Sequence, residues 1–212
     1  METGRVEAFS DGVFAVAITV LVFGLQLPGP RPGCRTTTCQ LLHAWPHYLA
    51  YVVSFLTIGI MWMNHHTIVA HVTRVDRPIL VINLLLLMGI VAIPFPTALV
   101  AEHLRNSGGK LATVTYGLVM IAISAGFAAL WVYVATHAAA LGAAVPPEAL
   151  RNSLRGWTLG GVAYVAGTLI AGFVSAVAGM VIFGALAVYY LFEHLPSPAE
   201  EAPSSSAPEP GP

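Results

Sequence analysis

Long apolar stretches, each close to the length that crosses a bilayer, recur along almost the whole chain. A membrane helix needs about 20 consecutive apolar residues, and six stretches of this 212-residue sequence reach or approach that length. They cover roughly residues 7–27, 46–71, 78–103, 111–137, 157–174 and 176–195. We therefore expect an all-α polytopic membrane protein, with a single six-helix domain over residues 1–195.

The scarcity of charge supports this reading. Charged residues make up 9% of the chain and hydrophobic residues 57%, and the mean hydropathy is +0.77. A soluble domain usually has about 25% charged residues, so this chain cannot coat a globule with polar groups and needs lipid as its main solvent. The net charge of −1 offers no basic face for nucleic acid. We expect the lipid bilayer, and not nucleic acid, as a partner.

Prolines end one of the apolar stretches and interrupt another. Pro28, Pro30 and Pro32 end the first stretch, and Pro94 and Pro96 fall inside the third. Because proline cannot donate the backbone hydrogen bond of a continuous helix, the third stretch is predicted to kink or end a helical segment there. The fifth and sixth stretches are predicted to form a hairpin with almost no loop.

The ends of the chain are predicted to lie on one side of the membrane, because the number of spans is even. Five of the nine basic residues fall on that side, which weakly favours a cell-membrane protein with both termini cytoplasmic. Residues 196–212 are rich in Pro, Ser and Glu. Such a composition cannot bury enough apolar surface to fold, so we expect a disordered tail.

A carboxylate stands near the start of the first apolar stretch. Asp11 follows Ser10, and Arg5 lies six residues before the carboxylate. An ionisable group in or at the edge of a membrane span is costly unless it is paired or faces water, which makes this group a candidate functional site. The plain alternative is a helix start, since Ser or Asp can cap a helix N-terminus.

The same stretch carries an apolar stripe at helical spacing. Val16, Val20 and Phe23 stand at i, i+4 and i+7, so they share one face of a helix, and Thr19 lies beside them. The stripe can face lipid or pack against a neighbouring helix, and periodicity alone favours packing.

A second polar cluster ends the second stretch and contains Trp62, His65 and His66. Adjacent histidines point about 100° apart on a helix and chelate a metal poorly, so no metal site is expected there. Indole and imidazole N–H groups can instead donate to Asp11, provided that the first stretch starts and the second ends on the same side. Asn83, inside the third stretch, can join this set.

Cys34 and Cys39 lie in the polar segment after the first stretch. They can form a disulfide if the segment faces outside, or remain two free thiols. Zinc would need further ligands. His43 and His47 are near in sequence, but we expect no metal and no other cofactor.

In its first three apolar stretches the chain resembles the transmembrane protein 175 family of potassium channels, in its bacterial form. The resemblance rests on Arg5-x-x-x-Phe9-Ser10-Asp11-Gly12-Val13-Phe14-Ala15-Val16-Ala17-Ile18-Thr19, on Trp62-x-x-His65-His66, on Asn83 and on Pro94-Phe95. The Phe-Ser-Asp motif with its flanks is specific, whereas the later helices are generic.

The resemblance implies a homotetramer of six-helix subunits whose first helices line a central pore for potassium ions. It implies that Val16, Thr19, Val20 and Phe23 line that pore, with the tightest apolar ring at Val16. It also implies a structural polar network, made by Arg5, Phe9, Ser10, Asp11, Trp62, His65, His66 and Asn83.

The chain departs from the family pattern at the apolar ring. The family usually has Ile or Leu at the three positions where this chain has Val16, Val20 and Phe23. We therefore expect a wider ring at Val16 and a narrowing at Phe23. No Thr-Val-Gly-Tyr-Gly filter occurs in the sequence, so selectivity would depend on pore radius, dehydration and the Thr19 hydroxyls.

The leading hypothesis is therefore a potassium-permeable cation channel with a hydrophobic constriction, and not an enzyme. The alternative is a proton-coupled transporter or proton pathway that uses Asp11, His65 and His66. A membrane scaffold without transport is a third hypothesis, favoured by the glycine-rich fifth and sixth stretches.

Overall fold

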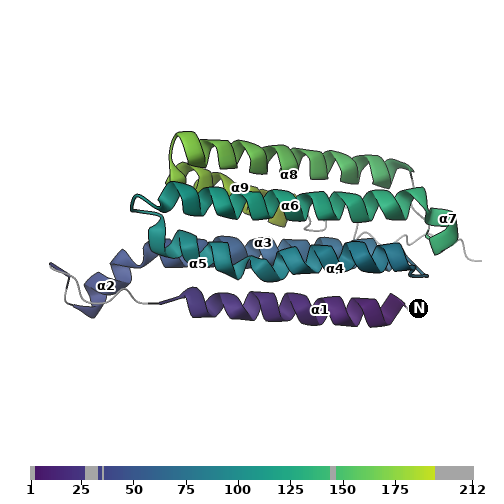
Figure 1. Cartoon of the computed structure of the whole chain (residues 1–212), viewed down its shortest axis with the longest axis horizontal. Coiled ribbons are helices and arrows are strands. Elements are labelled where there is room, and N and C mark those ends of the chain that lie inside the picture. Colours follow the sequence, from purple (N-terminus) through teal and green to yellow (C-terminus); the bar gives the residue numbers. More distant parts are fainter. Residues whose placement is uncertain (1–2, 27–32, 35, 144–146, 194–212) are drawn as a thin grey trace, which may run out of the picture.

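The computed structural model describes residues 3–26, 33–34, 36–143 and 147–193, and these residues form an all-α bundle. The long helices lie side by side with nearly parallel axes (Figure 1). The elements are α1 (Thr3–Val20), the 3₁₀-helix η1 (Leu21–Gly24), α2 (Thr37–His43), α3 (Trp45–Ala70), α4 (Arg77–Ala92), α5 (Pro94–His103), α6 (Gly109–Thr136), α7 (Ala138–Leu141), α8 (Pro147–Phe173) and α9 (Ala176–Glu193). The predicted tail, residues 196–212, lies outside the described residues.

Four segments of the described chain are long and apolar enough to cross a membrane. They are Thr3–Gly24, Trp45–Ala70, Arg77–His103 and Gly109–Thr136. The apolar parts of α8 and α9, Thr158–Phe173 and Ala176–Phe192, are shorter. The chain is therefore a multi-pass membrane protein, with four spans that length and composition support directly.

The third apolar stretch divides at Pro94, as predicted. Helix α4 ends at Ala92 and α5 begins at Pro94, because the proline nitrogen has no hydrogen to donate to the preceding turn. The Ile93 carbonyl accepts from the Thr97 N–H at 3.1 Å and from the Thr97 hydroxyl at 2.8 Å. The hydroxyls of Thr97 and Ser54 are hydrogen-bonded at 2.8 Å, so the break is held against α3 by buried polar contacts.

The turn before α4 connects two parts of the bundle. The Asp76 carboxylate caps α4 by accepting from the Ile79 N–H at 3.1 Å, and it accepts from the Tyr133 hydroxyl of α6 at 2.7 Å. Partial burial acts to raise the pKa of Asp76, but these hydrogen bonds bring that pKa below its ordinary value. An ionised Asp76 therefore fixes the start of α4 to the end of α6.

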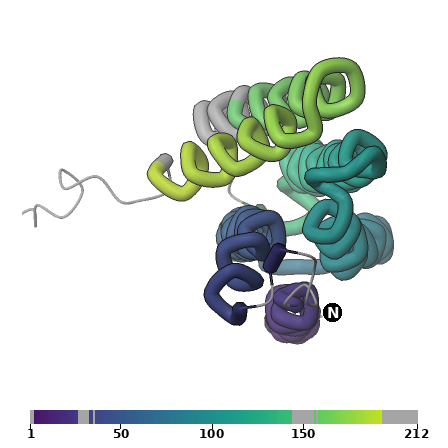
Figure 2. The backbone as a smooth tube through the Cα atoms, turned by 90° about the vertical axis from the view of Figure 1, so that its left-hand side faces the viewer, coloured from purple at the N-terminus to yellow at the C-terminus, as the bar shows by residue number. Residues whose placement is uncertain are grey.

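Helix α1 lies at the edge of the bundle, against α3 and α4 (Figure 2). Its buried residues are Val6, Ser10, Phe14 and Ala17, and Leu21 of η1 continues the same face. These positions repeat every three or four residues, as one face of a helix does. The opposite face of α1 is consequently turned away from the subunit.

Helices α8 and α9 form the predicted hairpin, with Phe173 and Ala176 bounding its turn. Gly167, Ala171 and Gly179, which we call the small-residue seam, let the two backbones approach closely. A Cβ added at Gly179 would lie 2.6 Å from the Ala171 Cβ and 2.9 Å from the Gly167 carbonyl oxygen. Small residues are a common means of close helix packing in membranes. Helix α8 also extends ten residues before the predicted start at Trp157.

Candidate functional site

A chain of buried hydrogen bonds joins α1, α3 and α4. His65 bonds through Nε2 to the Asn83 Oδ1 at 2.8 Å, and the Asn83 amide donates to the Ser10 Oγ at 3.0 Å. The Ser10 hydroxyl donates in turn to the Val6 carbonyl at 2.8 Å. All three side chains are buried. With the His65 Nε2 as donor, every step of this chain has one donor and one acceptor, and it ends on the backbone.

Two further contacts join α1 and α3 at a more exposed level. The Trp62 indole N–H donates to the Asp11 carboxylate at 2.8 Å, and the His66 Nδ1 lies 3.0 Å from the Glu7 carboxylate. The rings of Trp62 and His66 also stack, with centroids 6.2 Å apart. We call the residues of both levels the polar clasp: Glu7, Ser10, Asp11, Trp62, His65, His66 and Asn83.

The partner of His66 differs from the one that the sequence suggested. We expected His66 near Asp11, but it contacts Glu7, because α1 and α3 run in opposite directions (Figure 1). One turn back along α1, from Asp11 to Glu7, therefore matches one turn forward along α3, from Trp62 to His66. Sequence reasoning missed Glu7, although the four-residue spacing on both helices was a usable signal.

Two other expected members take no part in the clasp. No hydrogen bond or ion pair joins Arg5 to the rest of the described chain, and Arg5 is exposed. Phe9 is 56% exposed and lies seven residues before Val16, so it shares the outward face of α1. The clasp thus fixes the rotation of α1 without help from either residue.

The outward face of α1 carries the apolar stripe. Val16, Val20 and Phe23 have exposed fractions of 57%, 38% and 74%. Thr19 is also exposed, and its hydroxyl donates to the Val16 carbonyl at 2.9 Å. Because the hydroxyl hydrogen is used within the helix, the Thr19 oxygen presents its lone pairs to whatever lies outside.

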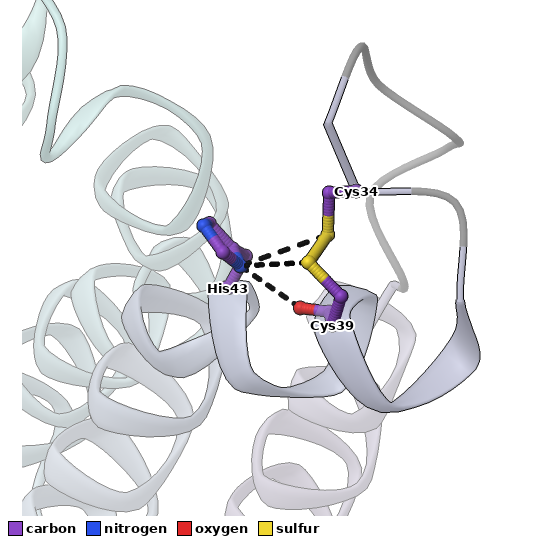
Figure 3. A group of neighbouring side chains, drawn as sticks. All are labelled: Cys34, Cys39 and His43. Atoms are coloured by element: carbon purple, nitrogen blue, oxygen red, sulfur yellow. Dashed lines mark hydrogen bonds between the residues drawn. A yellow bond between two sulfur atoms is a disulfide. The ribbon is translucent and has the colours of Figure 1, made fainter.

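Cys34 and Cys39, the latter on α2, are joined by a disulfide (Figure 3). Their Cα atoms are 5.5 Å apart. The imidazole of His43 lies against the bridge, and His47 belongs to the following helix, α3.

The family that known proteins indicate is matched over the part of the chain that contains the clasp residues. Residues 5–94 match the family model described as "Endosomal/lysosomal potassium channel TMEM175". A protein of Streptomyces collinus described as "Potassium channel B446_29190" is 44% identical over 211 residues, which cover 97% of this chain and 99% of the relative. The chain belongs to the TMEM175 family. The resemblance seen in the first helix is therefore confirmed.

The fold agrees with a solved TMEM175 structure. The crystal structure described as that of "a lysosomal potassium-selective channel TMEM175 homolog" from Chamaesiphon minutus matches with a TM-score of 0.79 and 35% identity, covering 90% of this chain and 97% of that one. A Gallus gallus relative described as "Endosomal/lysosomal proton channel TMEM175" is 33% identical over 141 residues, which cover 63% of this chain and 28% of that protein. The relatives of this TMEM175 chain are thus ion channels and not enzymes.

Proposed function

We propose that this protein is a potassium-permeable cation channel of the cell membrane, built as a homotetramer with α1 of each subunit around a central pore. The observation that carries the proposal is the orientation of α1. Ser10 and Asp11 are hydrogen-bonded to other helices of the subunit, while Val16, Val20 and Phe23 are exposed on a helix at the edge of the bundle. The potassium-channel descriptions of the bacterial relatives support the same function.

In such a tetramer the outward stripes of four α1 helices would face one another. An apolar ring at Val16 would oblige an ion to shed water before passing, and a ring of Thr19 oxygens beside it would offer partial compensation. Potassium loses its water more readily than the smaller sodium ion does. Selectivity would then arise from dehydration and the hydroxyl ring. Each subunit would cross the membrane six times, with both termini cytoplasmic.

Reversal potentials in proteoliposomes under a potassium/sodium gradient test the proposal. We expect a potassium-selective current, and Val16→Asn is expected to raise the conductance severalfold and weaken selectivity, because a polar ring wets the constriction. Val181→Asn on α9 is the matched control, because Val181 has a similar exposed fraction of 55%. Mass measurement of the detergent complex should give four chains.

An absence of cation current would overturn the channel proposal and favour the scaffold hypothesis. Equal currents from Val16→Asn and the wild type would remove Val16 from the pore wall. A monomer in every mild detergent would exclude a central pore lined by one helix from each subunit.

A second candidate is proton movement through Asp11, His65 and His66, which the proton-channel description of the vertebrate relatives favours. Against it, the buried hydrogen bonds from His65 end on the Val6 carbonyl, which cannot pass a proton onward. A proton pathway predicts that Asp11→Asn abolishes pH-driven flux. The clasp interpretation predicts that this variant lowers the stability of the α1–α3 contact and leaves proton flux unchanged.

A further inference from the structure

The disulfide segment after η1 brings a third metal-binding side chain to the two cysteines. Cys39 and His43 lie one turn apart on α2, and Cys34 reaches them from the preceding segment (Figure 3). The His43 Nδ1 is 3.7 Å from the Cys34 Sγ and 3.5 Å from the Cys39 Sγ. All three ligand atoms lie within 4.8 Å of one another.

These distances are close to those of a tetrahedral zinc site. With Zn–S bonds of about 2.3 Å and Zn–N bonds of about 2.0–2.1 Å, tetrahedral angles place nitrogen about 3.6 Å from each sulfur. The His43 Nδ1 therefore already lies at the distance from both sulfurs that three ligands of one shared zinc ion would have. Two sulfurs on one zinc are about 3.8 Å apart by the same geometry, so only the sulfurs need to separate.

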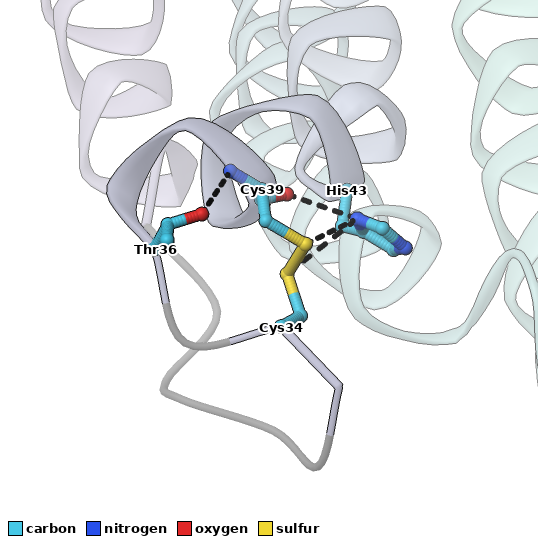
Figure 4. The surroundings of a disulfide bond; sticks show 4 residues. All are labelled: Cys34, Thr36, Cys39 and His43. Atoms are coloured by element: carbon cyan, nitrogen blue, oxygen red, sulfur yellow. Dashed lines mark hydrogen bonds between the residues drawn. A yellow bond between two sulfur atoms is a disulfide. The ribbon is translucent and has the colours of Figure 1, made fainter.

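The helix that carries two of the ligands is held independently of the disulfide. The Thr36 hydroxyl caps α2 by accepting from the Cys39 N–H at 3.3 Å (Figure 4). At the other end, the Ala44 N–H donates to the carbonyls of Gln40 and Leu41, and Ala44 is fully buried. Opening the disulfide would leave Cys39 and His43 on the same face of a capped helix.

We propose that Cys34, Cys39 and His43 form a redox-dependent site for a divalent metal ion of the zinc class. In the disulfide form both sulfurs are bonded to each other and the site is closed to metal. A dithiol reductant supplies two electrons and two protons, which convert the disulfide into two thiols while the dithiol becomes a disulfide. Thiolate sulfur and imidazole are ligands that zinc favours.

Metal uptake then proceeds by exchange of protons. The ion displaces the protons of both thiols, and two thiolates balance its charge. In the disulfide form the His43 Nδ1 donates to the Cys39 carbonyl at 2.9 Å. On binding metal, Nδ1 gives up that bond and the ring carries its proton on Nε2. Because His43 is exposed, water can occupy the fourth position.

Cobalt(II) added to the full chain in detergent, with and without prior reduction by dithiothreitol that is then removed, tests the site. Titration of free thiols confirms that the bridge has opened. We expect the reduced chain to bind one cobalt with a thiolate-to-metal charge-transfer band and tetrahedral visible bands, both removed by zinc. The disulfide form should give neither. A reduced chain without the charge-transfer band would overturn the proposal.

His43→Ala separates a three-residue site from a dithiol alone. Outer-shell partners of metal ligands change affinity by about 10- to 100-fold, so loss of a direct ligand should weaken zinc binding by at least that range. His71→Ala, at the opposite end of α3, is the matched control and should bind as the wild type does. His43→Gln, which keeps a polar side chain on α2, should repeat the loss. Unchanged affinity in either His43 variant would overturn the assignment of His43.

Discussion

Two regions of this molecule hold their helices in opposite ways. In the polar clasp, α1 is fixed by directional hydrogen bonds to α3 and α4. In the small-residue seam, α8 and α9 are fixed by shape, because glycine and alanine let their backbones approach. The clasp determines which face of α1 points outward, whereas the seam only requires that the two helices lie close together.

The difference matters for a helix at the edge of a bundle. Apolar packing alone would leave the rotation of α1 weakly specified, because the buried face and the outward face both carry apolar side chains. Hydrogen bonds between single atoms specify that rotation. The clasp therefore defines the outward stripe of Val16, Val20 and Phe23.

The largest effect is expected from Asn83→Leu, which removes the centre of the buried clasp. The His65 Nε2 would lose its only described hydrogen-bond partner, and the Ser10 Oγ would lose the Asn83 donor. A buried polar group that loses its partner costs about 1–3 kcal/mol, and the two losses add. Reversible unfolding in mixed micelles should show this loss. Leu84→Ala, on the exposed face of α4, is the control. An Asn83→Leu protein as stable as the wild type would mean that α1 is held by packing.

The seam should respond to added volume instead. We expect Gly179→Ala to lower the free energy of unfolding by about 1–3 kcal/mol, as overpacking does, because its neighbours include the backbone of α8. Gly161→Ala adds the same methyl to α8 where no atom lies within 4 Å. It should be neutral or slightly stabilising. Equal behaviour of both variants would show that the seam tolerates wider spacing.

The smallest effect is expected at Asp76, where α4 of the clasp region meets α6. Asp76→Ala removes a helix cap, which costs about 0.5–2 kcal/mol. Because the pKa of the folded Asp76 lies below its ordinary value, the stabilisation is present above about pH 4 and is lost as the pH falls through the folded pKa.

Unfolding of the wild type and Asp76→Ala should therefore differ most near neutral pH and converge in acid. Glu102→Ala serves as the control, because the Glu102 side chain is 65% exposed. A stability difference that grows on acidification would contradict the role given to the ionised carboxylate.

Much of this architecture was predictable from sequence, because proline and hydropathy act locally. The division at Pro94 and the short α8–α9 turn follow from the residues at those positions. The contact of Asp11 with Trp62 was also a reasonable prediction, since both belong to spans whose relevant ends share one side of the membrane.

Other features depend on rotations and offsets between helices that local patterns do not contain. Sequence reasoning placed Phe9 in the network, but the rotation of α1 puts it outside. It paired His66 with the wrong turn of α1. It named His43 and His47 as near the cysteines in sequence but could not place either one, whereas the structure brings the His43 imidazole against the bridge.

The 3₁₀ winding of η1 gives the outer end of the stripe its own geometry. A 3₁₀-helix turns 120° per residue and an α-helix about 100°, so Phe23 stands almost directly above Val20 along the axis. Rewinding η1 (Leu21–Gly24) as α-helix would swing Phe23 by about 60° over three residues and shorten the segment by about 2 Å. The direction of the largest side chain of the stripe therefore depends on the 3₁₀ winding of η1, and not only on the rotation at which the clasp holds α1.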